Sequence, residues 1–250
     1  MSGLRRHDED PRKLLIERRL ANVNNVIPVM SPKGGVGKTL ISTLMALAIA
    51  ENNSSVGILD LDVTNPSVHV ILNLDPGVKP SEDKGVIPPK VHGIKAMSIA
   101  YYTEGKPLPL RGSEITKVVR EILAITIWGS LDYLIIDTPP GMSDVHLEIL
   151  SNVGKARPLV VTTPHILSVY SVRSLLTILK EVGTPIVGLV ENMSENPTDV
   201  VIDLCREFKI RYLGNVPLES LLALSVGNMT LMKKTRAYSR VAEIIKRLSS

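Results

Sequence analysis

SPKGGVGKT, at residues 31–39, is the stretch that decides the fold of this chain. A short apolar run at 26–30 precedes it, and an apolar, helix-forming run at 40–50 follows it. A strand, a glycine-rich loop and a helix in this order are typical of a phosphate-binding loop. The backbone N–H groups of such a loop turn inward around a phosphate, and the start of the helix adds the positive end of its dipole. The sequence therefore predicts a P-loop between a strand and a helix.

The side chains of the loop match the chemistry of a nucleotide with Mg²⁺. Lys38 is placed to neutralise the β- and γ-phosphates, and the Thr39 hydroxyl to ligate the metal. Pro32 stands where the common form of the motif has its first glycine, and Lys33 is an additional cation. We expect seven residues to surround the phosphates of a nucleotide: Gly34, Gly35, Val36, Gly37, Lys38, Thr39 and Leu40.

The composition indicates one folded domain, or two at most. The chain has 250 residues, of which 44% are hydrophobic and 3% aromatic. A chain of this length can bury a large, aliphatic core, and the scarcity of stacking side chains argues against single-stranded nucleic acid as a ligand. Cys205 is the only cysteine, which fits a reducing compartment. The charged N-terminus and the short apolar runs predict neither a signal peptide nor a membrane span, and hence a cytoplasmic protein.

The positive charge gathers at the C-terminal end. Residues 231–250 carry six lysines and arginines against one glutamate, a net charge of +5 that leaves −1 for the rest of the chain's +4. Val241, Ile244, Ile245 and Leu248 follow the i, i+3, i+4, i+7 spacing of one helical face. We favour a terminal helix packed on the sheet with a solvated basic face. The alternative is a helix that binds a membrane surface or nucleic acid.

From Val26 onward, short β-forming runs alternate with helix-forming segments. Six further strands are expected at 55–61, 94–100, 133–137, 157–163, 185–192 and 210–217. Helices are expected near 39–51, 113–126, 145–152, 166–181, 199–208, 219–226 and 237–248. This alternation predicts an α/β fold with a doubly wound, mainly parallel sheet of about seven to eight strands and helices on both faces. Residues 76–93, rich in Pro, Gly and Lys, are expected to form a long loop.

Before the first strand, the pair Asp10-Pro11 indicates an N-cap followed by proline at the first helical position. We expect a helix from there to about Leu20, as an addition to the main domain. The predicted domains are an N-terminal helical appendage at 1–25 and a P-loop domain at 26–250.

Acidic residues stand at the ends of two predicted strands. Because ligands of a parallel sheet bind at the carboxyl ends of its strands, these residues are candidates for the site. Asp137 ends one strand, where its carboxylate can hold a Mg²⁺-bound water opposite Thr39. Asp60 and Asp62 end another, and alternation points both to the same side. We expect Asp62, the outer residue, to orient the attacking water, and Asp60 to be structural or to support the residues that contact the ligand.

Longer segments resemble one family, in order along the chain. They are GILDLDVTNPSVHVIL at 57–72, RGSEITKVVREILAITIWGSLDYLIIDTPPGMSD at 111–144, VVTTP at 160–164, GLVENMS at 188–194 and YLGNVPLE at 212–219. In these segments the chain is similar to the Mrp/ApbC iron-sulfur cluster carrier ATPases of the MinD-like P-loop group. The resemblance covers about residues 12–245. WGSLDYLIIDTPPG is specific to this branch, whereas KGGVGKT is shared with partition and arsenite ATPases.

The resemblance implies a Mg-dependent, slowly hydrolysing ATPase that works as a homodimer. The deviant loop form KGGxGK[ST] of these proteins sends its first lysine, here Lys33, to the nucleotide of the facing subunit. By the same resemblance, Lys33, Lys38 and Asp62 are the catalytic residues, and Asp62 is the aspartate of switch I.

Further site residues follow from the resemblance. Asp137 and Gly141 would form switch II, and Thr39 with Asp137 would hold Mg²⁺, the latter through water. Asn192 would read the adenine edge, with the backbone near Pro217 closing the base pocket. From the residues alone, Asn192 ends a strand and offers the donor and acceptor that adenine requires, and a turn-capping role is the alternative.

One departure concerns the cargo of the family. Its carriers have a CxxC soon after ENMS, and pairs from two subunits hold a bridging [4Fe–4S] cluster, whereas this chain has ENPTDV at 195–200. Cluster irons normally need four thiolates, and a dimer of this chain has two cysteines. Cys205 lies near Val201, Leu204 and Phe208 on an expected helix, which indicates a buried structural thiol. We therefore do not expect the chain to hold a stable iron-sulfur cluster by itself.

Three functions remain open from the sequence. The first is an iron-sulfur assembly ATPase that lacks cluster ligands or takes them from a partner, with assembly or client proteins as partners. The second is a MinD/ParA-like positioning ATPase that uses the basic C-terminal helix on membrane or DNA, and the third is an ATP-dependent scaffold or regulator. The family segments favour the first function, and the missing CxxC argues against it.

Overall fold

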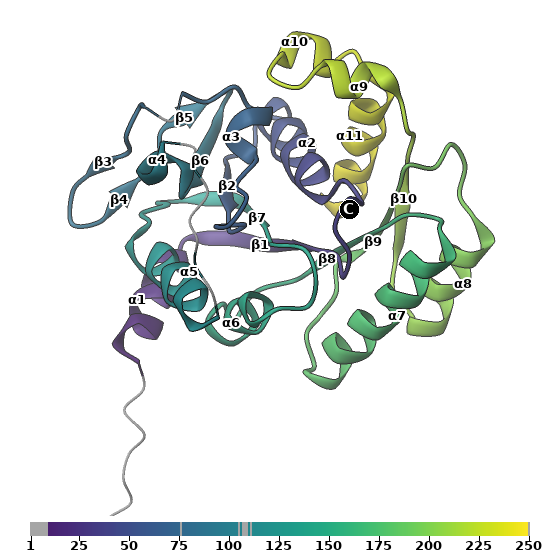
Figure 1. Cartoon of the computed structure of the whole chain (residues 1–250), viewed down its shortest axis with the longest axis horizontal. Coiled ribbons are helices and arrows are strands. Elements are labelled where there is room, and N and C mark those ends of the chain that lie inside the picture. The colour runs from purple at the N-terminus through teal and green to yellow at the C-terminus, as the bar shows by residue number, and fades with distance from the viewer. Residues whose placement is uncertain (1–9, 76, 105, 107–109, 111, 250) are drawn as a thin grey trace, which may run out of the picture.

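One eight-stranded sheet runs through the molecule in the order β10-β9-β8-β1-β7-β2-β6-β5 (Figure 1). Its strands are β1 (Val23–Met30), β2 (Val56–Asp60), β5 (Lys90–Val91), β6 (Ile94–Ser98), β7 (Leu131–Asp137), β8 (Leu159–Thr162), β9 (Gly188–Asn192) and β10 (Tyr212–Val216). Neighbouring strands are parallel except β5 with β6. This computed structural model describes residues 10–75, 77–104, 106, 110 and 112–249. The predicted doubly wound, mainly parallel sheet is confirmed.

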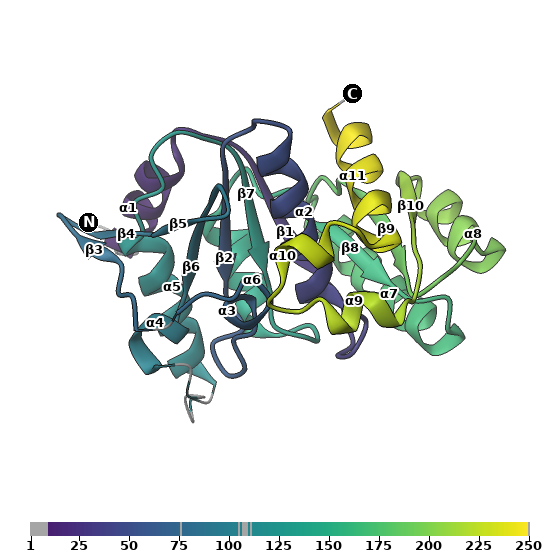
Figure 2. The same ribbon diagram turned by 90° about the horizontal axis from the view of Figure 1, so that it is seen from above.

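Helices cover both faces of the sheet, with α2 and α11 on one face and α5, α6 and α7 on the other (Figures 1 and 2). The helices are α1 (Pro11–Leu20), α2 (Lys38–Glu51), α3 (Val68–Ile71), α4 (Ala100–Thr103), α5 (Ser113–Ile125), α6 (Asp144–Asn152), α7 (Ile166–Glu181), α8 (Asp199–Phe208), α9 (Ser220–Leu224), α10 (Met229–Met232) and α11 (Arg236–Ser249). The central helix α2 is apolar on all sides and buried from Ile41 to Ile49, because it lies between the sheet and α11.

β1 begins at Val23, three residues before the predicted start. Asn24 and Asn25 interrupt the apolar pattern that marks a buried strand. Both side chains bond to Asp132 at the start of β7, and Asn25 Nδ2 donates to its carbonyl oxygen at 3.1 Å. The polar start of this strand is thus held by a neighbouring strand, which the local sequence does not show.

The prediction of a long loop at 76–93 is wrong for the described part of that segment. β3 (Ser81–Glu82) and β4 (Val86–Ile87) form a small antiparallel hairpin, and β5 pairs with β6 at the edge of the main sheet. Lys84 and Gly85 have φ values of 53° and 150°, so the turn uses conformations that favour glycine. Strands of two residues are too short to produce a recognisable alternation in the sequence.

α11 packs against the body of the domain, as the favoured interpretation of the C-terminal segment predicted. Val241, Ile244 and Ile245 are buried, and the helix contacts α2 and β10. On its solvent side, Arg236 pairs with Glu195 and Arg240 with Glu243. The apolar stripe is therefore used inside the fold.

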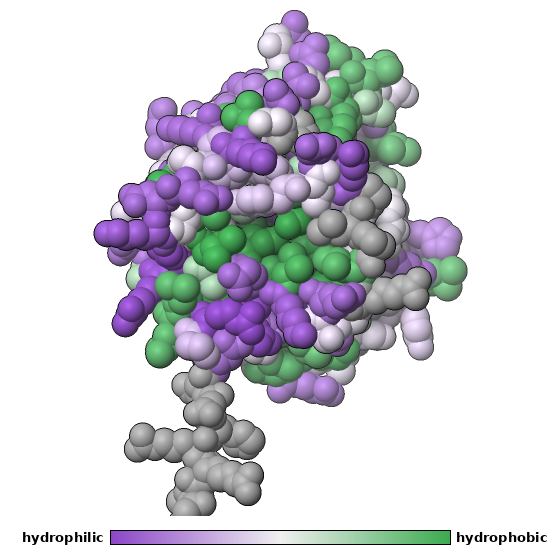
Figure 3. All heavy atoms as spheres, turned by 60° about the vertical axis from the view of Figure 1, so that its left-hand side comes forward, coloured by the Kyte–Doolittle hydropathy of each residue, from purple (hydrophilic) through white to green (hydrophobic). Residues whose placement is uncertain are grey.

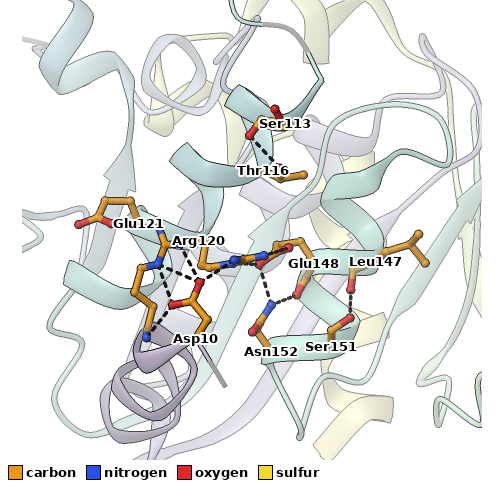
Figure 4. Close-up of polar contacts among 10 residues, drawn as sticks. Asp10, Ser113, Thr116, Arg120, Glu121, Leu147, Glu148, Ser151 and Asn152 are labelled. Atoms are coloured by element: carbon orange, nitrogen blue, oxygen red, sulfur yellow. Dashed lines mark hydrogen bonds and ion pairs between the residues drawn. The ribbon is translucent and has the colours of Figure 1, made fainter. Parts of the chain in front are cut away.

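α1 is tied to the domain by apolar and polar contacts. Ile16 and Leu20 belong to the main hydrophobic core cluster. Asp10 caps α1 by accepting from the backbone N–H of Arg12 at 3.0 Å. Arg120 of α5 donates to Asp10 and, through two nitrogens, to Glu148 of α6 (Figure 4). The division of the chain at residue 25 stays a prediction, and residues 1–9 lie outside the described residues.

A close approach between β2 and the segment before β7 requires a glycine. The buried Trp128 ring lies over Gly57, where an added Cβ would be 2.7 Å from the ring. Real Cβ atoms essentially never come so close to another heavy atom. Gly57 therefore allows the tryptophan of this largely aliphatic core to pack closely against β2.

Exposed apolar side chains follow the carboxyl ends of β8 and β10. Ile166, Leu167 and Tyr170 are exposed at the start of α7, which follows β8, and Leu218 and Leu224 are exposed around α9, which follows β10. On the face seen in Figure 3, hydrophobic side chains also gather in a hollow that hydrophilic ones surround. Among the described residues, no helix is both long enough and apolar enough to span a membrane.

Candidate nucleotide site

The loop at 31–37 connects the carboxyl end of β1 to the start of α2, in the middle of the sheet. Gly37 is the N-cap of α2 and no side chain caps this helix, so its first N–H groups remain available to a ligand. Gly37 has a φ of +80°, and a Cβ there would lie 2.3 Å from Asn192 Nδ2. The loop thus leaves a cradle for an anion that a larger residue at this position would disturb.

Asp137 receives three side-chain hydrogen bonds from the first turns of α2. Lys38 Nζ lies 2.7 Å from Oδ1, Thr39 Oγ1 donates to Oδ2 at 2.7 Å, and Ser42 Oγ donates to Oδ1 at 2.9 Å. Lys38 and Asp137 are both buried. A carboxylate and a hydroxyl at this distance are suitable oxygen donors for Mg²⁺ and its waters. The residues expected to handle phosphate and metal therefore lie together.

Ser42 is part of this cluster and was absent from the predicted site. Its position four residues after Lys38 and three after Thr39 places it on the same side of the helix. That spacing is the signal in the sequence that could have identified it.

Asp60 has a structural role, as expected. Its Oδ2 accepts from the backbone N–H groups of Ser67 and Val68, at 3.0 and 3.2 Å, at the start of α3. Burial, followed by the neighbouring Asp137 carboxylate, raises the pKa of Asp60 to about 7. Because Asp60 is fully buried and bonded to backbone in this way, it orders the segment after β2 and is not among the residues that line the cavity beside the loop.

Asp62 faces the open space beside the loop. A cavity of about 440 Å³ is lined by Lys33 to Leu40, Asp62, Asn65 and Pro140 among others. Asp62 Oδ1 accepts from Thr64 Oγ1 at 3.0 Å and from the Asn65 N–H at 3.1 Å. Burial raises the pKa of Asp62. The carboxylate is thus oriented by its own loop at the edge of the cavity.

Lys33 is exposed at the outer end of the loop. It also lines a neighbouring cavity of about 470 Å³ with His165, Leu167 and Met193. The exposed apolar start of α7 adjoins this cavity through Leu167. The Lys33 side chain therefore lies on a solvent-exposed surface, at the same end of the sheet as the nucleotide loop.

Asn192 contacts the loop from the end of β9. Its buried Nδ2 donates to the carbonyl oxygen of Val36 at 2.7 Å, so the amide helps to hold the loop. Pro217 is buried and follows β10 directly. The roles of Asn192 and Pro217 at an adenine base stay predictions.

The segment after ENMS is held by a buried carboxylate. Glu191 accepts from the N–H and the hydroxyl of Thr198, at 3.1 and 2.7 Å, and from Tyr212 Oη at 2.9 Å. Cys205 is buried behind this cluster, and burial, followed by Glu191, raises the pKa of its thiol to about 11. The interpretation of Cys205 as a buried structural thiol is confirmed, and the residues of this segment do not fit a thiolate-bound cluster.

The fold and the loop define a P-loop NTPase with the deviant loop form. The model of the ParA family described as NUBPL iron-transfer P-loop NTPase matches residues 22–250. The chain belongs to this family, and the resemblance seen in the sequence is confirmed.

The names of similar proteins refer to the assembly or carriage of iron-sulfur clusters. The cytosolic Fe-S cluster assembly factor NUBP2 of Mus musculus is 35% identical over 253 residues, which cover 92% of each chain. The iron-sulfur cluster carrier protein of Pseudomonas fragi is 38% identical over 178 residues, and these are 70% of this chain and 62% of that protein.

Solved structures share the fold of this chain. A nucleotide-binding protein of Archaeoglobus fulgidus in complex with ADP has a TM-score of 0.76 and 30% identity, covering 91% of this chain and 95% of that one. The septum site-determining protein MinD of Pyrococcus horikoshii, complexed with Mg-ADP, has a TM-score of 0.66. It covers 90% of this chain and 96% of its own, at 16% identity, and shows the fold alone.

Proposed function

We propose that this protein binds Mg·ATP, hydrolyses it slowly as a homodimer, and uses the cycle in iron-sulfur cluster assembly without holding a cluster through its own thiols. The observation that carries the nucleotide part is the Asp137 carboxylate with its three donors from α2. Lys38 pairs with Asp137 and directly follows the loop that would bind the phosphates. Thr39 and Asp137 would hold Mg²⁺, which supplies charge neutralisation on the phosphate oxygens.

Asp62 is the residue best placed to orient water for in-line attack. It lines the same cavity as the loop, and two hydrogen bonds fix one carboxylate oxygen. Its second oxygen accepts no hydrogen bond from the residues that the structure describes, so it remains available to a water molecule. Slow hydrolysis fits a site that is completed only when a second subunit brings another cation.

Asp62→Ala tests this role. The variant should bind Mg·ATP as the wild type does and lose about 100-fold or more in turnover, the range of a positioned acid or base. Asp203→Ala, which removes an exposed carboxylate on α8, should leave both quantities unchanged. Wild-type turnover in Asp62→Ala would exclude the assignment.

The homodimer is supported by the exposed Lys33 and by the apolar residues beside it. Light scattering with and without a non-hydrolysable ATP analogue should show the mass double only when the analogue and Mg²⁺ are present. Lys33→Ala should stay monomeric, whereas Lys234→Ala, which removes an exposed lysine elsewhere, should dimerise normally. Equal mass in all conditions would contradict the proposal.

The iron-sulfur part is supported by the relatives, whose names assign them to cluster assembly or carriage. Because the segment after ENMS offers no thiol, the chain would act on a cluster held by assembly or client proteins. We place this activity in the cytoplasm, as the names of the NUBP2 relatives suggest for those proteins. Co-purification should recover an iron-containing partner that is retained by ATP and released after hydrolysis.

A further inference from the structure

A second cavity lies on the other side of Asp62 from the nucleotide cavity. Its volume is about 280 Å³, and it is enclosed by the segment after β2, the segment after β7 and the first turn of α5. The two cavities share Asp62 and Pro140. An occupant of the second cavity would therefore lie beside Asp62, which also lines the nucleotide cavity.

The walls of this cavity are mainly apolar. Leu61, Val63 and Val145 are buried side chains that form its floor, and Ile115 and Pro139 are partly buried beside them. A floor of buried side chains keeps its shape when a ligand enters. The volume lies just below the range of small-molecule sites, about 300–1,000 Å³, and suits one long side chain.

The charged groups that line it, among the described residues, are both acidic. They are Asp62 and Asp144, the first residue of α6. The Asp144 side chain is exposed and makes no ion pair or hydrogen bond with the described residues. The hydroxyls of Thr64, Thr116 and Ser143 add acceptors around the same opening. An apolar floor with two carboxylates at the opening is complementary to a long side chain that ends in a cation.

We propose that this cavity receives one arginine or lysine side chain of a partner protein. The methylene stem would lie on the apolar walls, and the cationic group would pair with Asp62 and Asp144, as amphipathic basic side chains do at interfaces. Because the same carboxylate is required to orient water, a bound cation draws it away from the nucleotide. The partner then slows hydrolysis and leaves Mg·ATP affinity unchanged. This last consequence rests on the proposed function, whereas binding of the cation does not.

The binding test uses a peptide and its neutral counterpart on the full chain. Acetyl-Gly-Arg-Gly-amide should bind with millimolar affinity, measured by NMR shift perturbation. The peptide with citrulline, which has the same shape without the charge, should bind at least 5-fold more weakly. Asp144→Asn should weaken arginine-peptide binding by a similar factor, while Asp203→Asn on α8 should not. Equal binding of the two peptides, or unchanged binding to Asp144→Asn, overturns the proposal.

Two further outcomes would assign the cavity to a different occupant and overturn the proposal. Free n-butylguanidinium that binds while the peptide does not would assign the cavity to a small organic cation and overturn the partner proposal. Arg111 precedes Gly112 of the cavity in sequence and lies outside the described residues. Arg111→Ala should bind the peptide as the wild type does. Binding that occurs only after this substitution would show that the chain fills the cavity with its own cation.

The kinetic test compares turnover with and without saturating arginine peptide. Turnover should fall at least 3-fold, with less than a 2-fold change in Mg·ATP affinity. A peptide that binds without changing turnover contradicts the regulatory step. The rate of the wild type without peptide shows separately whether the proposed ATPase is active, so the two failures can be distinguished.

Discussion

Removing Lys38 should damage both the fold and the nucleotide site, and a second substitution should separate the two effects. The Lys38 and Asp137 side chains are 7% and 1% exposed and lie 2.7 Å apart. Removing one partner of a buried pair leaves an uncompensated charge and costs about 3–5 kcal/mol. The hydroxyls of Thr39 and Ser42 still donate to Asp137, so we expect about 3 kcal/mol, the lower end of that range.

For a domain of this size, such a loss lowers Tm by roughly 6–12 °C, at about 2–4 °C per kcal/mol. The double variant Lys38→Ala/Asp137→Asn no longer contains the buried charge, and it should recover most of the lost stability. Mg·ATP binding should be absent from both variants, because the cation that neutralises the phosphates is missing from each.

Thermal unfolding by circular dichroism and calorimetric titration with Mg·ATP measure the two quantities on the same samples. The expected order of Tm is wild type, then the double variant, then Lys38→Ala. A Lys38→Ala protein as stable as the wild type would refute the reasoning, and so would a double variant no more stable than the single one. Retained Mg·ATP binding in Lys38→Ala would refute the assignment of the loop.

Four further predictions follow from single residues. Gly37→Ala should lose Mg·ATP binding in titration, because its Cβ would meet Asn192 in a backbone conformation that disfavours alanine. Val241→Ala should lower Tm by roughly 4–8 °C, since a buried side chain of the α11 stripe costs about 2 kcal/mol to truncate. The raised pKa of Asp60 means that the native protein binds a proton that the unfolded chain releases. Stability should therefore fall as pH rises from about 4 to about 7, and less so in Asp60→Asn, as urea unfolding at several pH values will show. Anaerobic reconstitution should give no stable [4Fe–4S] absorbance; stoichiometric iron and sulfide that are lost in Cys205→Ser would overturn this expectation.

The sequence predicts the central part of the fold because local signals agree there. The apolar run of β1, the glycine loop and the apolar helix α2 follow one another in the order that a phosphate-binding loop requires, and Asp137 directly ends an apolar strand. These signals also place the candidate site, since strand ends of a parallel sheet meet at one edge.

What the sequence could not predict depends on contacts between distant segments. Asn25 pairs with Tyr133 of β7, and its side chain donates to the carbonyl oxygen of Asp132 on the same distant strand. The hairpin β3–β4 is stabilised by a segment distant in the sequence, since the N–H of Ile127 donates a hydrogen bond to the carbonyl oxygen of Val86. The sequence assigned Asp60 the structural role, and the structure adds the reason, since the backbone N–H groups of Ser67 and Val68 donate to it from the start of α3.

The segment at 191–198 contacts the nucleotide loop and two helices, so its residues have structural roles in this chain. Asn192 holds the P-loop at Val36, Glu191 closes the start of α8 through Thr198, and Glu195 pairs with Arg236 of α11. In the family pattern this region is followed by the thiols that carry a cluster. Here the same backbone links the nucleotide loop to two helices that pack on the sheet. The segment thus contributes contacts and no thiol, which is why the proposed function takes the cluster ligands from another protein.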